Sequence, residues 1–413
     1  MSSDIRAILH IGAPKCGSSA LQTALSQTPD VSGDAGQFAY TALVHQRAGR
    51  VQTLSGRRLR RAARRSIFGY QSCPSLPTEA QAPETWDALR RVLRADADGG
   101  GPTRPILSNE SWLAHSTRFG QILQDAGNPP VRAFAYVRPP LDWLNAAYWQ
   151  WGLWTGLSFG DWLSRWNMPY RMGTQLDDWA TIPGVQLNVR LLDRDVVDSF
   201  ATDLGVTLPR PARANTASAP ALLGFLLRNR AQFRPGPHAA ANEFVVARWC
   251  PDLPRRALWA LNPADVRRVR GENGAEVRRL MAHLPEASLH SDPRWTEEWP
   301  YHELIKGGRT YLRDMDEIAT LFDSLVAGVR RATEASGARC PDMPRTPPPG
   351  TDIEGWDAAI AQVFVTLIKA DQQWRLGRGR AWLKSWLRSR DGLADHGRTT
   401  GGKQGLRTTS SGK

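Results

Sequence analysis

Short apolar runs alternate with amphipathic stretches along the first half of the chain. The runs at 7–11 and 134–137 are each followed by a segment with helical periodicity, and each is apolar enough for a buried strand. Further strands are predicted at 105–108 and 185–192, and a helix over 193–205 that ends at a glycine. Alternating strands and helices are typical of a parallel sheet covered by helices, so we expect an α/β fold with a parallel central sheet.

The first strand leads into a glycine-rich loop and a helix start, in the sequence GAPKCGSSAL from Gly12 to Leu21. Such a loop directs free backbone N–H groups and the positive end of a helix dipole at one spot, which suits phosphate or sulfate. Lys15 adds charge, and Ser18 and Ser19 add hydroxyl donors. The two loop glycines have the separation of a Walker A motif, but Ser18 stands where that motif has its lysine. The loop therefore predicts an anion site and argues against an ordinary ATPase or GTPase.

A second candidate anion contact follows the strand at 134–137. Arg138 would lie at the carboxyl end of this strand, which is the edge where open α/β sheets bind ligands. Its planar guanidinium suits a phosphate group. Two prolines come next and suit the first turn of a helix, which would carry Tyr148.

Together these segments resemble the sulfotransferases that use 3′-phosphoadenosine 5′-phosphosulfate (PAPS), in particular the bacterial carbohydrate-type enzymes. The loop matches the family's 5′-phosphosulfate motif, P-K-x-G-T/S-T/S-x-L, and the Arg138 segment matches its 3′-phosphate motif. The resemblance covers roughly residues 5–230 and implies a P-loop-like sulfotransferase fold with PAPS as donor and no metal. One residue departs from the pattern, because Ala146 stands where the family has a serine that would bond the 3′-phosphate. The resemblance implies that the donor is bound by Pro14, Lys15, Cys16, Gly17, Ser18, Ser19, Arg138 and Tyr148.

The resemblance also implies catalytic roles. Sulfuryl transfer builds negative charge on the leaving phosphate oxygen, which Lys15 could stabilise. A general base must take the proton of the acceptor hydroxyl, and family members use His or Glu for this step. His45 and Glu110 are the two candidates in this chain, and His302 or another residue is the remaining alternative.

Charge and aromatic content narrow the choice of acceptor. The chain has 53 Lys and Arg against 40 Asp and Glu, and this net charge of +13 favours anionic partners. Several of its 17 tryptophans follow Arg138, and aromatic faces stack on sugar rings. We therefore expect a carbohydrate or glycolipid acceptor, sulfated on a hydroxyl or an amine, and no specific nucleic acid. The four cysteines contain no C-x-x-C pair, so neither a disulfide framework nor a zinc site is expected.

Differences in composition divide the 413 residues into four consecutive segments. Residues 1–290 are expected to form the sulfotransferase domain, with 31–100 as an insertion on the acceptor side. Residues 291–350 are interpreted as an extension with a Pro-rich linker, and 351–390 as a helical, basic segment. Within it, 374–390 interleaves Trp and Leu with Arg and Lys, as helices at a membrane surface do. Residues 391–413 are rich in Gly, Ser, Thr and Lys and are predicted to be disordered.

Neither a signal peptide nor a transmembrane stretch is predicted, so we expect a cytoplasmic protein, with peripheral contact at the inner face of the membrane as an option. Two other functions remain open. One is a P-loop kinase-like nucleotide phosphotransferase, which the displaced lysine and the lack of a clear Walker B carboxylate disfavour. The other is a non-catalytic polyanion- or membrane-binding protein with a degenerate nucleotide fold, which Ala146 and the basic C-terminal region keep open.

Overall fold

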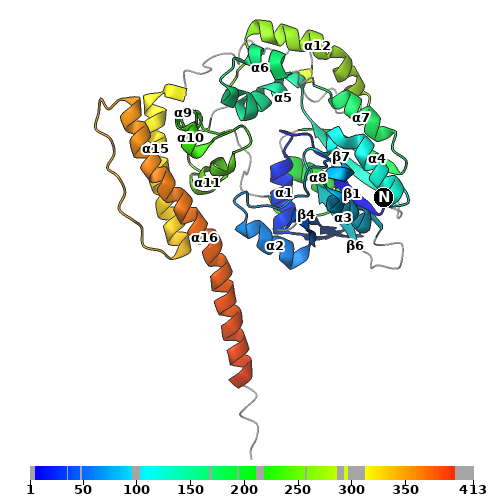
Figure 1. Ribbon diagram of the computed structural model, residues 1–413, viewed down its shortest axis with the longest axis horizontal. Helices are drawn as coiled ribbons and strands as arrows, with labels where there is room; N and C mark the ends of the chain where they lie inside the picture. The colour runs from blue at the N-terminus through cyan, green and yellow to red at the C-terminus, as the bar shows by residue number, and fades with distance from the viewer. Residues whose placement is uncertain are drawn as a thin grey trace, which may run out of the picture.

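A computed structural model describes residues 5–34, 36–46, 49–94, 103–166, 170–192, 195–210, 218–255, 258–285, 293–295 and 312–395. Its centre is a six-stranded sheet in the order β2-β3-β6-β1-β7-β8, in which all pairs except β2–β3 are parallel (Figure 1). The expected α/β fold with a parallel central sheet is therefore confirmed. The strands are β1 (Ala7–His10), β2 (Asp30–Gly33), β3 (Gly36–Tyr40), β6 (Thr103–Ser108), β7 (Val131–Val137) and β8 (Val185–Leu191).

The central position of β1 determines where a site can form. Ile8 pairs with Ile106 on one side and with Arg132 on the other, and all four residues of β1 are buried. Because β6, β1 and β7 run parallel, their carboxyl ends meet at one edge of the sheet. The loop after β1, the turn after β6 and Arg138 after β7 consequently emerge together.

Two groups of helices cover the sheet. In one group α1 packs against α8 and α2; in the other, α4 contacts α3 and α7, and α12 contacts α5 and α7. A short π-helical turn, η4 (Tyr148–Gly152), continues α5. The α-helices are α1 (Ser18–Gln27), α2 (Gly56–Arg65), α3 (Pro83–Arg94), α4 (Ser116–Asp125), α5 (Pro140–Ala147), α6 (Phe159–Trp166), α7 (Met172–Ala180), α8 (Val196–Leu204) and α12 (Pro263–Met281). Short 3₁₀ turns are η2 (Glu79–Gln81), η3 (Trp112–His115), η5 (Leu153–Thr155) and η6 (Pro293–Trp295).

The structure corrects the extent of the insertion that was expected at 31–100. Most of β2 and all of β3 fall in this range, yet they extend the central sheet, with β3 parallel to β6. The reason is local: Gly33 and Gly36 face each other across a tight turn, and Phe38 and Tyr40 alternate into the core. The next strands, β4 (Ala42–His45) and β5 (Val51–Leu54), form a separate antiparallel pair.

A second hydrophobic core, which we call the helical core, lies beside the core of the sheet. It is built by α9 (Pro220–Arg228), α10 (Arg230–Phe233), α11 (Ala241–Trp249), α15 (Met315–Ser336) and the first part of α16 (Ile353–Asp395). Helices α15 and α16 pack along each other, and α15 lies inside the segment that was expected to be an extension and linker.

The far end of α16 runs away from the rest of the molecule (Figure 1). It reaches Asp395, so residues 391–395 are helical rather than disordered, because a helix once formed adds residues at little cost. Residues 396–413, the rest of the expected tail, lie outside the described residues. None of the helices in the described ranges combines the length and apolarity that crossing a bilayer requires.

Candidate functional site

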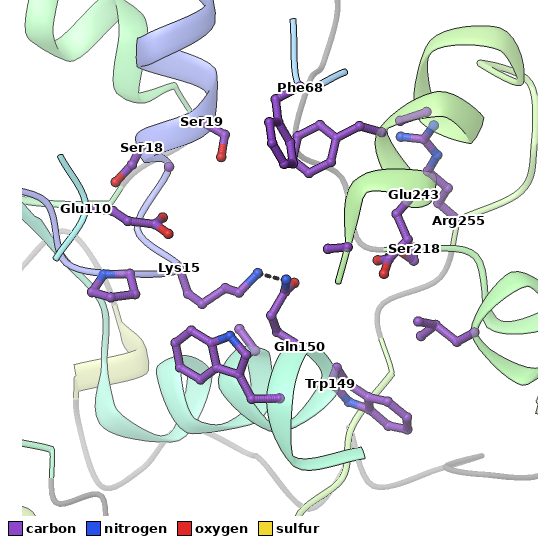
Figure 2. Close-up of a pocket in the computed structure, with 18 of the residues that line it drawn as sticks. Lys15, Ser18, Ser19, Phe68, Glu110, Trp149, Gln150, Ser218, Glu243 and Arg255 are labelled. Carbon is purple, nitrogen blue, oxygen red and sulfur yellow. Dashed lines mark hydrogen bonds between the residues drawn. The ribbon is translucent and has the colours of Figure 1, made fainter. Parts of the chain in front are cut away.

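A cavity of about 750 Å³ opens at the carboxyl edge of the sheet, a size within the range of small-molecule sites. One wall is formed by the loop after β1, by Glu110, by Arg138 and by α5. The facing wall comes from residues 68–70 and from α9, α11 and the segments around them. Figure 2 shows the two walls, with Lys15 and Glu110 on one side and Phe68, Glu243 and Arg255 on the other.

The loop after β1 presents unused hydrogen-bond donors to this cavity. Gly17 precedes α1 in the left-handed conformation (φ 89°), which leaves the first amides of the helix directed outward. The Ser18 hydroxyl is buried and has no partner within the described part of the chain. An unpaired buried hydroxyl at a helix N-terminus fits a site that an anion completes.

Lys15 carries the positive charge of the loop. Its Nζ donates to Oε1 of Gln150 at 2.5 Å, across the cavity wall (Figure 2). Burial lowers the pKa of the Lys15 amine to about 8; the charge of Glu110 counteracts this shift, and that of Arg138 adds to it. A bound anion would stabilise the ammonium that burial disfavours.

Gly12 allows Glu110 to lie beside this loop. Its φ is +79°, and a Cβ atom there would come within 2.4 Å of the Glu110 Cα. The Glu110 side chain faces the cavity on the same side as Lys15 (Figure 2). The surrounding walls raise the pKa of its carboxyl by desolvation, while the charges of Lys15 and His238 lower it.

Arg138 and one face of α5 complete this wall. The hydroxyl of Tyr170 donates to the Arg138 carbonyl at 2.6 Å and fixes the backbone where β7 ends. Ala146 faces the cavity, as a residue in contact with a ligand would. The adjacent Asn145 amide is already used, since it donates to Leu258 O and accepts from Ala260 N, both at 2.9 Å.

Two of the residues expected to bind the donor do not line the cavity. Tyr148 is buried and donates its hydroxyl to Leu157 O at 2.8 Å; it follows Leu141 and Leu144 at helical spacing, on the core face. Cys16 is also buried, its N–H is used by Ala13 O at 3.2 Å, and burial raises the pKa of its thiol to about 12. The other expected residues line the cavity, namely Pro14, Lys15, Gly17, Ser18, Ser19 and Arg138.

The structure does not bring His45 to this site. His45 is exposed at the end of β4, and its Nε2 lies 3.4 Å from the Thr85 hydroxyl rather than in the cavity. It ends an antiparallel pair separate from the main sheet, so the strand geometry does not direct it toward Lys15. Glu110 does line the cavity, and His302 lies outside the described residues.

Comparisons of the sequence and the structure with known proteins do not assign the chain to a family. No family model matches the chain, and no curated protein matches its sequence. Among solved structures, the chain is similar to the crystal structure of a sulfotransferase from Alicyclobacillus acidocaldarius, at 18% identity over 68% of this chain and 98% of that one. The TM-score is 0.33, which is too low to support either fold or function.

His238 and Gln150 are among the polar residues of the cavity that sequence reasoning missed. His238 faces it from the loop between α10 and α11, close enough to Glu110 for its charge to act on that carboxyl. It follows an irregular Pro-Gly-Pro stretch, so no strand end or helix pattern marks it. Gln150 lies in a π-helical turn, which shifts side-chain directions away from those of a regular helix.

The facing wall has polar groups of its own. Glu243 accepts from the Ser218 hydroxyl at 2.6 Å and forms an ion pair with the buried Arg234. Arg255 is half-buried, and burial lowers the pKa of its guanidinium; no acceptor for it is found among the described residues. The described residues contain no group of three His, Cys, Asp or Glu side chains that could hold a metal ion. The arrangement can therefore bind an anionic ligand through cations and amides and place a carboxylate beside it.

Proposed function

We propose that the chain is a sulfotransferase that moves a sulfuryl group from PAPS to a hydroxyl, or an amine, of a carbohydrate or glycolipid acceptor. The observation that carries this proposal is the loop after β1, with Lys15 and two serines at a helix N-terminus, opening into the same cavity as Arg138. A phosphosulfate on the loop and a 3′-phosphate at Arg138 would each meet positive charge. The resemblance of both segments to the sulfotransferase motifs supports the same assignment.

In the proposed reaction the acceptor oxygen attacks the sulfur in line with the bond to the 5′-phosphate. The new S–O bond forms as the old one breaks, and the electron pair of the broken bond stays on the phosphate oxygen. Lys15 stabilises that oxygen by charge, aided by the free amides at the start of α1. Lys15 would have to leave Gln150 to do so, because its Nζ now donates to that side chain.

The acceptor proton needs a base in the cavity. Glu110 faces Lys15, and desolvation raises the pKa of its carboxyl toward the range useful for a base. His238 lines the same space and is the second candidate. His45 does not line the cavity, so it is not placed to take this proton.

Calorimetry with 3′-phosphoadenosine 5′-phosphate tests the donor site. We expect binding that Lys15→Ala and Arg138→Ala each weaken by about 10- to 100-fold, since each removes a charge-assisted contact. His45→Ala serves as the control and should bind as the wild type does. Failure of the bisphosphate to bind would refute the proposal, and binding of ATP–Mg²⁺ in its place would support the phosphotransferase alternative. Binding without sulfate transfer to any acceptor would leave the non-catalytic alternative.

We infer in addition that residues 374–390 give peripheral contact with the inner face of the cytoplasmic membrane. The support is that α16 continues beyond the helical core (Figure 1), with Trp and Leu interleaved with Arg in its sequence. Sedimentation with vesicles of anionic phospholipid tests this. The full chain should pellet with the vesicles, and the double variant Trp382→Glu, Trp386→Glu should stay in solution. Wild-type protein that stays in solution at low salt would refute the contact.

A further inference from the structure

We propose that the wall facing the anion loop binds a hydrocarbon chain, so that the acceptor is an amphiphile with a hydroxyl-bearing head and an apolar tail. This inference rests on the proposed function and selects the lipid-linked acceptor over a free carbohydrate. We call the surface the apolar wall; it consists of Phe68, Tyr70, Leu222, Leu223, Phe244 and Leu253.

Three aromatic rings form the part of the apolar wall nearest the loop. Phe68 meets Phe244 edge to face, with ring centroids 5.1 Å apart, and lies 5.9 Å from the ring of Tyr70. Phe68 is nevertheless 41% exposed, although it is a large apolar side chain. Exposed aromatic surface of this kind is stabilised when an apolar ligand covers it.

Aliphatic side chains extend this surface away from the loop. Leu222 and Leu223 come from α9, and Leu253 follows α11, so the helical core supplies them. Three alanines, Ala219, Ala240 and Ala247, line the same side, and their small side chains leave room between the larger ones. The three leucine side chains are almost fully buried, so they close the cavity beneath the aromatic rings with apolar atoms.

Two of the polar groups beside the apolar wall, Ser218 and Glu243, are unavailable to a sugar, while Arg255 on this wall is a cation that suits an anionic group rather than a neutral sugar. Ser218 and Glu243 bond each other at 2.6 Å, and Glu243 is also paired with Arg234. Hydroxyls of a sugar placed there would lose water and find these groups already engaged. A hydrocarbon tail forms no hydrogen bonds, so it needs no free polar partner on this wall.

The apolar wall adjoins the proposed site of chemistry directly. The Tyr70 hydroxyl lies 3.4 Å from that of Ser19 in the anion loop. A tail on the apolar wall would therefore leave the head group next to the loop, where Lys15 and Glu110 face the cavity (Figure 2).

Binding of n-alkyl β-glucosides tests this inference, because the sugar stays constant while the tail grows. Calorimetry would compare methyl to hexyl glucoside, kept below micelle formation, with and without 3′-phosphoadenosine 5′-phosphate. We expect affinity to rise about three- to fourfold for each added methylene. Phe68→Ala should flatten that rise and leave bisphosphate affinity unchanged. Met315→Ala is the matched control, since Met315 is equally exposed (40%) but lies outside the cavity.

Two results would overturn the inference. Equal affinity for methyl and hexyl glucoside would show that no tail is bound, whatever the bisphosphate does. Displacement of the longer glucosides by the bisphosphate would show that the apolar wall belongs to the adenosine instead. If the glucosides follow the expected series while the bisphosphate fails to bind, the apolar wall stands as a tail-binding site and the proposed sulfuryl transfer falls.

Discussion

Lys15 combines two unfavourable features in one residue. Its backbone is left-handed (φ 65°), and its amine is buried enough to lower its pKa to about 8. Strained backbone and desolvated charge each reduce stability, and both persist mainly where the surrounding structure uses them. The combination marks this residue more strongly than the sequence motif alone does.

The lowered pKa of Lys15 predicts a pH dependence of anion binding. The ammonium is the binding form, so affinity for the bisphosphate should fall as pH rises above about 8, by up to about tenfold per pH unit. The free energy of unfolding of the free protein should instead rise between about pH 8 and pH 10.5. In this range the unfolded chain still holds the Lys15 proton that the folded chain has lost. Calorimetry and urea unfolding at several pH values measure both.

Lys15→Arg is the control for this pH dependence, because a guanidinium stays charged throughout that range. The variant should lose the decline in affinity above pH 8. A decline of the same size in the variant would assign the titration to another group.

Ala146 offers a prediction of gained affinity. It faces the cavity on α5, at the position where the resemblance places a serine. Ala146→Ser should tighten binding of the bisphosphate by about 2- to 10-fold, the effect of one added hydrogen bond. Adenosine 5′-phosphosulfate lacks the 3′-phosphate and should bind both forms equally. An equal gain for both nucleotides would place the hydroxyl away from the 3′-phosphate.

At the scale of elements, the approach of the β1 loop to the turn after β6 is a sharp constraint. Gly12→Ala should destabilise the protein by about 1–2 kcal/mol through its positive φ, and by a further ~1–3 kcal/mol through contact with the Glu110 backbone. Gly156 has nearly the same φ (+78°) with open space around it, so Gly156→Ala should show only the loss of about 1–2 kcal/mol that comes from the positive φ. Denaturant midpoints compare the two, and equal losses would contradict the role of close packing.

Two buried carboxylates of α16, Asp357 and Asp371, bond to neighbouring helices, and Asp371 is the more deeply buried of the two. Asp371 accepts from Arg248 at 2.5 Å, from the Trp249 indole at 2.9 Å and from Arg375 at 2.7 Å. Asp371→Ala removes the carboxylate that pairs the charges of Arg248 and Arg375 and bonds the Trp249 indole, and should cost about 3–5 kcal/mol of unfolding free energy. Asp252→Ala breaks an exposed pair with Arg331 and should cost less than about 1 kcal/mol. Similar losses for both would show that the buried position of Asp371 confers no special role.

The strands that precede the anion loop and Arg138 could be predicted because they are continuous apolar runs ending in polar residues. The β2–β3 pair could not, since its four- and five-residue strands interrupt polar sequence and gain their stability from pairing with β6. His238 was missed for a related reason: it reaches the cavity through tertiary packing of an irregular loop. Tyr148 was misplaced because a motif gives its position on a helix but not which face is buried.

At the scale of the whole molecule, the cavity lies between two cores. The loop after β1, Glu110 and Arg138 are anchored in the sheet, whereas α9 and α11 belong to the helical core. A ligand that contacts both walls binds only when the two cores are assembled, so its binding free energy adds to the stability of their union. An occupied cavity would then act as a cross-link between the two cores, so that the protein with ligand bound unfolds in a more cooperative transition than the free protein does.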